Sequence, residues 1–381
     1  MTSEGSVDGD TFTAHNSTVT IKALEDITFA GDITASGSQV AMNAVAGSIT
    51  GVKLTAVNSH VTMKALEDIT LTGDASKPGD LVTSGSDVVV NSVAGAFSGN
   101  KLTAVGGSVT VQTAEDITLG GDIEASGSEV QLLTAKGGIS GKHFTAQGGS
   151  NVTLQAAEDI DVDGNIRIVD STVKMLTSEG SVDGDTFTAQ NGTVTIKALE
   201  DITFDGDVKI SGSEVKLLTS AGAFSGNKFT AVGSSVTVLT LEDITLNGDI
   251  RISDSKVVLF ASEGALTSGN FTAARSEVAI QTGEDVSLSG DINILGGQVT
   301  MASAGSVSAK EFTASGTEVA ILANNNITLA GDINAVDSTL SFTGTNGSIT
   351  GNHILVSNSD VHLKAGKSVM AYSLQSEDSH V

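Results

Sequence analysis

Paired carboxylates recur along this chain at near-constant intervals, and they are the residues whose type and spacing could do chemistry. They are of two kinds, Glu-Asp pairs and Gly-Asp pairs. The first of them are Glu25-Asp26, Glu67-Asp68 and Glu115-Asp116, with Gly31-Asp32. Carboxylates in ordered arrays can bind calcium, exchange protons with a substrate, or hold a backbone turn. The residues around them decide among these three uses.

Two short strings of aspartates resemble calcium-binding loops. They are Asp8-Gly9-Asp10 and Asp161-Val162-Asp163-Gly164-Asn165. Neither string has the ligand spacing of an EF-hand or of a glycine-aspartate nonapeptide repeat. Asp8, Asp10, Asp161 and Asp163 are therefore calcium candidates, and calcium is the one cofactor that the sequence leaves open. At the Gly-Asp pairs the favoured interpretation is a turn, because glycine permits a positive φ and aspartate bonds nearby amides.

Catalysis on a repetitive scaffold would need a local break in the pattern, with clustered Asp, Arg or His and aromatic platforms for sugars. The six histidines are scattered, and no G-x-S-x-G, H-E-x-x-H or nucleotide-binding glycine string occurs. Outward threonines such as Thr20 and Thr62 recur only every second turn and lie beside lysines, which argues against an ice-binding array. We expect no catalytic residue and no enzymatic activity.

The charge balance excludes further classes of partner. Acidic residues outnumber basic ones 45 to 19, for a formal net charge of −26. Nucleic acids and anionic membranes need Lys/Arg footprints, so neither is an expected partner. No apolar run approaches the roughly 18 residues of a membrane span, and the first residues do not begin a signal peptide. Because the chain has no cysteine, it has neither disulfides nor thiolate metal sites.

The acidic pairs mark an internal repeat. From Asp26 to Ser368, successive pairs or their replacements are spaced by 42, 48, 43, 42, 42, 42, 41 and 42 residues. The one large deviation is an insertion at 75–80 that contains Pro78, the only proline, and it predicts a loop. Each unit divides again, because residues 12–32 and 33–53 share an apolar-Thr-Ala start, a central valine and an Ile-Thr near the end.

Apolar residues alternate within each turn of about 21 residues, which is typical of strands. Since like strands return every turn, they must stack in parallel, and parallel crossovers are right-handed. We predict an all-β fold, a right-handed parallel β-helix (β-solenoid) of about 18 turns with a 42-residue double-turn repeat. It forms one domain, 1–381, with a polar C-terminal end at 375–381. The predicted core ladder is Phe12, Leu54, Leu102, Phe144, Phe187, Phe229, Phe271 and Phe312.

The Glu-Asp corner alternates with a neutral corner such as Gly47-Ser48. Alternation doubles the distance between like charges, and repulsion in water falls by about half when the distance doubles. The 42-residue period is therefore interpreted as a device for spacing charge, with a binding stripe as the alternative.

The unit resembles the haemagglutinin-type repeats of filamentous haemagglutinin-like exoproteins through its Val-Thr-Ile-Lys-Ala, Glu-Asp-Ile-Thr and Gly-Asp-Ile strings. These large bacterial adhesins are secreted through a partner pore. The resemblance implies a right-handed β-helix shaft, bacterial-type secretion, an extracellular or cell-surface location, and a role in adhesion, biofilm formation or contact-dependent toxin delivery.

Two functional hypotheses follow. Residues 2–32 are almost identical to residues 177–207, so Met1 falls in mid-turn. Open turns present unpaired strand edges. The chain is expected to be a structural element of an extracellular fibre or stalk, whose partners are further copies stacked end to end or neighbouring segments of a longer shaft. The alternative is the shaft of a secreted adhesin that binds a surface receptor or glycan.

Overall fold

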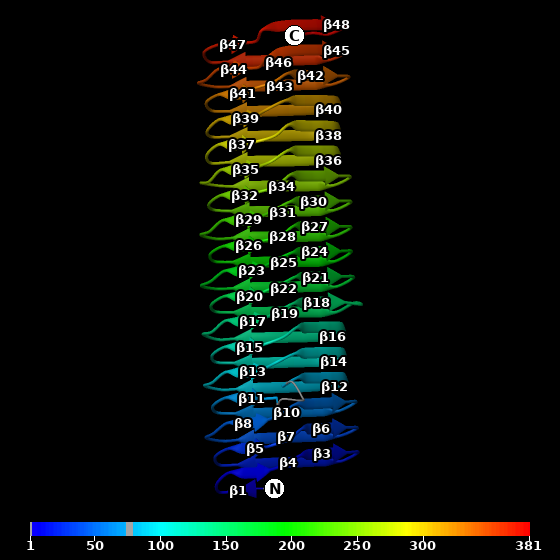
Figure 1. The fold of residues 1–381 in the computed structure, drawn as a ribbon, viewed down its shortest axis with the longest axis vertical. Coiled ribbons are helices and arrows are strands. Elements are labelled where there is room, and N and C mark those ends of the chain that lie inside the picture. The colour runs from blue at the N-terminus through cyan, green and yellow to red at the C-terminus, as the bar shows by residue number, and fades with distance from the viewer. Residues whose placement is uncertain (1, 74–78) are drawn as a thin grey trace. The chain divides into compact units, whose positions relative to one another are not determined.

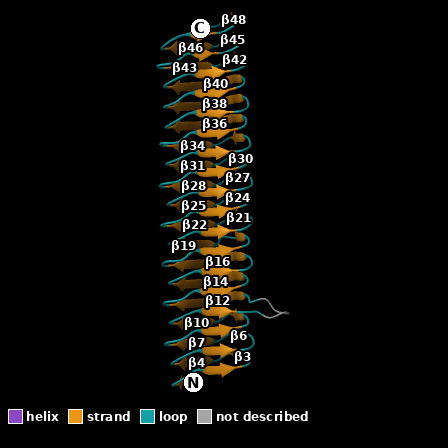
Figure 2. Ribbon diagram, turned by 60° about the vertical axis from the view of Figure 1, so that its left-hand side comes forward, coloured by secondary structure: helices purple, strands orange, loops and turns teal. Residues whose placement is uncertain are grey.

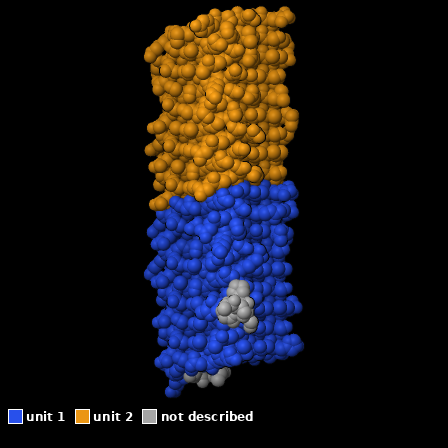
Figure 3. All heavy atoms as spheres, viewed as in Figure 1, with its two compact units in different colours: residues 1–198 blue, residues 199–381 orange. Residues whose placement is uncertain are grey.

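A computed structural model describes residues 2–73 and 79–381 as strands joined by short turns, with no helix (Figures 1 and 2). Residues 75–78 of the expected loop lie outside the described residues, whereas Gly79 and Asp80 lie within them. The chain divides into two compact units, Met1–Ala198 and Leu199–Val381 (Figure 3), and each is described by itself.

Unit 1 repeats strands of three lengths, preceded by β1 (Thr2–Ser3). The three-residue strands are β2 (Val7–Gly9), β5 (Ile27–Phe29), β8 (Ile49–Gly51), β11 (Ile69–Leu71), β13 (Phe97–Gly99), β15 (Ile117–Leu119), β17 (Ile139–Gly141), β20 (Ile160–Val162) and β23 (Val182–Gly184). The four-residue strands are β3 (Phe12–His15), β6 (Ile33–Ser36), β9 (Leu54–Val57), β18 (Phe144–Gln147), β21 (Ile166–Val169) and β24 (Phe187–Gln190). The six-residue strands are β4 (Thr18–Ala23), β7 (Gln39–Ala44), β10 (His60–Ala65), β19 (Asn151–Ala156), β22 (Thr172–Thr177) and β25 (Thr193–Ala198). In three turns the last two kinds merge, as β12 (Leu81–Ser92), β14 (Leu102–Thr113) and β16 (Ile123–Thr134).

Unit 2 has the same plan. Its shortest strands are β26 (Ile202–Phe204), β29 (Phe224–Gly226), β32 (Ile244–Leu246), β35 (Leu266–Ser268), β37 (Val286–Leu288), β39 (Val307–Ala309), β41 (Ile327–Leu329), β44 (Ile349–Thr350) and β47 (Val369–Met370). Strands of four or five residues are β27 (Val208–Ser211), β30 (Phe229–Val232), β33 (Ile250–Ser253), β42 (Ile333–Val336), β45 (His353–Ser357) and β48 (Ser373–Glu377). Six-residue strands are β28 (Glu214–Thr219), β31 (Ser235–Thr240), β34 (Lys256–Ala261), β43 (Thr339–Gly344) and β46 (Asp360–Ala365). The merged strands are β36 (Phe271–Thr282), β38 (Ile292–Ser303) and β40 (Phe312–Ala323).

Within each unit, a strand pairs in parallel with its counterpart about one turn later. On β18, β21 and β24, for example, Phe144 aligns with Ile166 and Ile166 with Phe187. Figure 1 shows these strands stacked turn on turn. The predicted parallel β-solenoid with turns of about 21 residues is confirmed. The strands make about 17 turns, against the 18 expected from dividing the whole chain by 21.

The residues of the predicted core ladder face inward on every second turn. An aliphatic residue occupies the same position on each turn between them. In unit 1, Leu54 and Leu102 flank Leu81 in register. Leu54, Leu102, Phe144 and Phe187 are fully buried, as are Phe229, Phe271 and Phe312 in unit 2. Phe12, in the first complete turn of unit 1, is half-buried.

The inward end of the three-residue strand alternates between a large and a small residue. In unit 2, Phe204 on β26 is followed one turn later by Gly226 on β29. In unit 1, Gly9 on β2 is followed one turn later by Phe29 on β5, and a Cβ on Gly9 would lie 2.9 Å from Cδ1 of Phe29. The double-turn repeat therefore also exists in the core, because one bulky residue fills the width of two turns.

A buried serine row holds the corner between the four- and six-residue strands. The residue before each serine has left-handed backbone, as at Asn58 (φ 46°) and Gly85 (φ 55°), which suits Asn and Gly. Oγ of Ser59 accepts a hydrogen bond from the backbone amide of Ser38 at 3.2 Å. Oγ of Ser86 accepts one from the backbone amide of Ser59 at 3.1 Å. Each serine therefore satisfies a buried backbone amide of the preceding turn.

Candidate functional site

The aspartate of each Glu-Asp corner accepts a hydrogen bond from the backbone of the next turn. Oδ1 of Asp26 accepts it from the amide of Ser48 at 2.8 Å, and Oδ1 of Asp116 accepts it from the amide of Gly138 at 2.9 Å. Oδ1 of Asp68 accepts the amide of Ala96 in the same way, at 2.8 Å. The glutamates Glu25, Glu67 and Glu115 are exposed. Glu25 accepts a hydrogen bond from Oγ of Ser6, and Glu67 accepts one from Oγ of Ser48, each at 3.3 Å. The aspartate thus has a structural use, and the glutamate stays at the surface.

The neutral corner between two Glu-Asp corners has a steric cause. A Cβ added to Gly47 would lie 2.3 Å from Oδ1 of Asp26, and one on Gly137 would lie 2.2 Å from Oδ1 of Asp116. Glycine is therefore the residue that leaves room for the carboxylate of the preceding turn. Charge spacing is a poor explanation, because Glu263 precedes Gly264 in just such an intervening corner. That corner has the glycine, but it carries the negative charge of Glu263 and is not neutral.

The Gly-Asp corners also link successive turns by hydrogen bonds and ion pairs. Oδ1 of Asp80 accepts a hydrogen bond from Nδ2 of Asn100 at 3.0 Å, and Oδ2 of Asp80 forms an ion pair with Nζ of Lys53 at 3.6 Å. In unit 2, Oδ1 of Asp249 accepts both the amide and Nδ2 of Asn270, at 3.0 and 2.9 Å. The backbone bond from Asn270, more than any other cause, holds the pKa of Asp249 below its ordinary value. These contacts fit a structural use of the corner, but the reason expected for its glycine is wrong at Gly31, whose φ is not positive. A Cβ on Gly31 would lie 2.7 Å from Cγ2 of Thr11 and 2.9 Å from the carbonyl oxygen of Asp10, so close packing requires the glycine there. Gly31 and Asp32 are both partly exposed.

The four calcium candidates lie on the outer surface. Asp8 and Asp161 lie on β2 and β20, and Asp10 and Asp163 follow close after these strands. Asp161 aligns with Asp183 of the next turn, and burial, with the charges of Asp163 and Asp159, raises its pKa. Among the described residues no group of three or more His, Cys, Asp or Glu side chains has the arrangement of a metal site. Calcium binding stays a prediction.

A row of hydroxyl groups runs along the three-residue strands of unit 1, one per turn. Thr28 aligns with Thr50, Thr50 with Thr70, and Thr70 with Ser98. Sequence reasoning singled out other threonines, which recur every second turn. The signal for this row was the Ile-Thr near the end of each turn. An aspartate replaces the hydroxyl in the first turn, at Asp8, and in the last two turns of unit 1, at Asp161 and Asp183.

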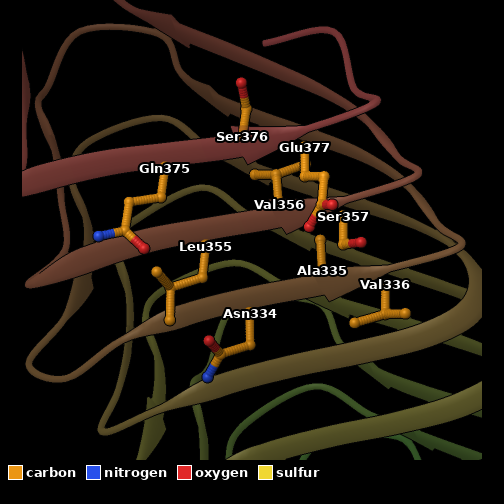
Figure 4. Close-up of a pocket in the computed structure, with 9 residues that line it drawn as sticks. All are labelled: Asn334, Ala335, Val336, Leu355, Val356, Ser357, Gln375, Ser376 and Glu377. Atoms are coloured by element: carbon orange, nitrogen blue, oxygen red, sulfur yellow. The ribbon is translucent and has the colours of Figure 1, made fainter.

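A groove lies on unit 2, across β42, β45 and β48 (Figure 4). Its volume is about 400 Å³. Two rows of outward side chains form its walls, and the inward-facing residues between them form its floor. The walls are Asn334, Leu355 and Gln375, and Val336, Ser357 and Glu377. Amide, apolar, hydroxyl and carboxylate side chains thus line an open surface groove, which suits contact with a partner rather than enclosure of a substrate.

Comparison of the chain with known protein families, curated proteins and solved structures found no match. The class is therefore defined by the fold, a parallel β-solenoid. In the described part of the chain, no helix has the length and apolar character needed to cross a membrane.

Proposed function

We propose that this chain is a non-enzymatic structural element of an extracellular fibre or stalk. The observation that carries the proposal is the bonding of each turn to the next. Parallel backbone ladders join successive turns, and the serine row and the corner aspartates add side-chain bonds in the same direction. A shaft needs this combination, because every bond between turns resists bending and separation of the turns. The resemblance to the repeats of filamentous haemagglutinin-like exoproteins supports the extracellular location.

The end-to-end form of the proposal would use the edge formed by β46, β47 and β48. Leu374 and Val369 align with Ile354 and Ile349 of the preceding turn. Ile354 and Ile349 are 2% and 1% exposed, whereas Leu374 and Val369 are 50% and 44% exposed. Such an edge accepts one more turn, supplied by a longer polypeptide or by another copy through strand addition.

Negative-stain electron microscopy of the purified chain, at micromolar concentrations with and without calcium, tests assembly. We expect filaments that lengthen with concentration. Leu374→Lys combined with Val369→Lys should leave single particles, because two charges would have to be buried at the junction. Leu295→Lys is the matched control, since Leu295 is 56% exposed on β38, away from the edge.

Filaments that persist in the double variant, or that the control also abolishes, would contradict assembly through this edge. Single particles of the unaltered chain under every condition would exclude self-assembly and leave the chain as one segment of a longer shaft.

The adhesin alternative is favoured by the groove on β42, β45 and β48. Leu355 stands there at an outward position that Thr313 occupies on β40. Under this alternative, Leu355→Thr should weaken attachment of protein-coated beads to cells or glycan arrays and should leave filament formation unchanged. Equal attachment by the variant and the unaltered chain would remove the groove as a receptor site.

A further inference from the structure

Phe260 breaks the rule that phenylalanine faces the core of this molecule. It lies on β34 between Leu259 and Ala261, which are 1% and 0% exposed. Because side chains alternate across a strand, Phe260 points outward, and it is half-buried. The phenylalanines of neighbouring turns, such as Phe229 on β30 and Phe271 on β36, are fully buried.

The neighbours of Phe260 on the outer face are also apolar. Phe260 aligns with Leu239 on β31, and Leu239 aligns with Leu218 on β28. Val258 lies two residues before Phe260, and Leu241 lies two residues after Leu239. We call Leu218, Leu239, Leu241, Val258 and Phe260 the Phe260 patch. Its central row crosses three adjacent strands at about 4.8 Å per turn, with Leu239 37% exposed.

Acidic side chains border the patch on its corner side. Glu242 directly follows Leu241, and Glu263 is in the next turn, where its amide bonds the carbonyl of Leu241 at 2.8 Å. Glu284 follows one turn later, its amide 3.0 Å from the carbonyl of Gly264. All three glutamates are exposed, and among the described residues no ion pair joins them to a cation.

The opposite border is close to neutral. Nζ of Lys216 lies 2.8 Å from Glu214, and Nζ of Lys256 lies 2.7 Å from Glu277. The patch therefore combines an apolar row with an unpaired acidic row on one side only. Both rows repeat once per turn of the solenoid.

We propose that the Phe260 patch is a docking site for a basic amphipathic helix of another protein. A helix rises about 5.4 Å per turn, close to the spacing of the solenoid turns. Its apolar stripe can therefore contact Leu218, Leu239 and Phe260 in succession. A basic stripe beside it then faces Glu242, Glu263 and Glu284. This is a lateral contact, which depends neither on end-to-end assembly nor on the groove near β48.

Charge favours this occupant over a second copy of the chain. The formal net charge is −26, so two copies repel one another, and in an antiparallel face-to-face pair their acidic rows would lie side by side. A cationic partner gains from the same row. An apolar helix without basic residues would leave the glutamates without compensation.

Fluorescence anisotropy with the full chain tests the site, with a synthetic 15-residue peptide as the probe. The peptide carries leucines along one helical face and lysines along the rest, and a scrambled peptide of equal composition is its control. Phe260→Gln places at this position the residue type found one turn later, at Gln281. Leu176→Gln is the matched variant, because Leu176 points outward on β22 between Gln155 and Lys197.

We expect Phe260→Gln to weaken binding of the amphipathic peptide by about tenfold or more, because a large apolar contact is lost. Leu176→Gln should bind like the unaltered chain. Replacement of Glu242, Glu263 and Glu284 by Gln should weaken binding and reduce its dependence on salt. Circular dichroism should show unchanged strand content in every variant.

Three results would overturn the site. They are equal affinity for Phe260→Gln and the unaltered chain, equal losses for Phe260→Gln and Leu176→Gln, and equal binding of the scrambled peptide. Lateral dimers of the chain alone, detected by sedimentation velocity and removed by Phe260→Gln, would assign the patch to a second copy instead.

Discussion

Turns with a Glu-Asp corner and the turns between them pair in register, yet they differ at two linked places. The first kind has an aspartate at the corner and a large residue at the end of its three-residue strand, as in Asp201 with Phe204. The second kind has glycine at the corner and a small residue at the end of the strand, as in Gly222 with Gly226. The comparison shows that the repeat is two turns long because bulk in one turn requires space in the next.

Phe204→Ala would remove the bulk from one turn while the space in its neighbour remains. Phe204 is 1% exposed, and its ring centroid lies 6.2 Å from that of Phe224. We expect the free energy of unfolding to fall by about 3–5 kcal/mol, measured by urea denaturation followed by circular dichroism. Phe260→Ala, on the outer face, is the control and should cost about 1 kcal/mol or less. Similar losses for both variants would contradict the inward and outward assignment.

Gly137→Ala would instead remove the space. The added Cβ would lie 2.2 Å from Oδ1 of Asp116 and 2.6 Å from its backbone nitrogen, so the corner must shift. We expect a loss of about 1–3 kcal/mol. Gly120→Ala is the matched control, because its Cβ would meet no atom closer than 3.6 Å. An unchanged urea midpoint for Gly137→Ala would show that the glycine is not required by the neighbouring aspartate.

Asp116→Ala would keep the space and remove only the hydrogen bond to Gly138. The expected loss is about 0.5–1.5 kcal/mol, less than for either change of volume. Asp116→Asn should retain most of the stability, since Oδ1 of Asn326 accepts the amide of Ser348 at 2.9 Å in an equivalent corner. Thermal unfolding of the two variants measures the difference. If Asn were as destabilising as Ala, the charge rather than the hydrogen bond would matter.

The sequence predicted the strands well because both of its periods, the alternation of apolar residues and the 42-residue repeat, can be found in the chain without knowing any distance in the structure. Alternation places residues such as Val61 and Met63 inward, and the 42-residue period fixes which turns stack. The reason for the double turn was not predicted, because it depends on distances between turns. The sequence shows glycine at the intervening corners, such as Gly47 and Gly137, but only the short distance between Gly137 and Asp116 explains why it is there.

The surface sites were also beyond the sequence argument. Phe260 stands in the run Val257-Val258-Leu259-Phe260-Ala261, where every residue is apolar and alternation gives no phase. The burial of Leu259 and Ala261, with the register between Phe260 and Leu239, identifies the outer face. The groove beside Leu355 likewise depends on alignment with Asn334 and Gln375, which are about 20 residues away in the chain.

The smallest expected effect comes from an exposed link between two successive turns. Nε and Nη2 of Arg275 donate to the two carboxylate oxygens of Asp254 at 2.7 and 2.8 Å. The bonds from Arg275, with one from Ser253, lower the pKa of Asp254 from 3.8 to about 2. Since the folded pKa lies below the unfolded one, this stabilisation is complete above pH 3.8 and is lost as the pH falls toward 2.

Arg275→Gly would remove the link at a corner whose φ of 48° glycine adopts readily, so backbone strain does not obscure the result. Other carboxylates titrate in both proteins, and only the difference between their unfolding temperatures reports on this pair. That difference should be small at neutral pH, because both side chains are exposed and solvent screens them. It should shift in favour of the variant as the pH falls toward 2, where the protonated Asp254 no longer gains from Arg275. A difference that stays constant across this range would mean that the ion pair contributes nothing to joining the two turns.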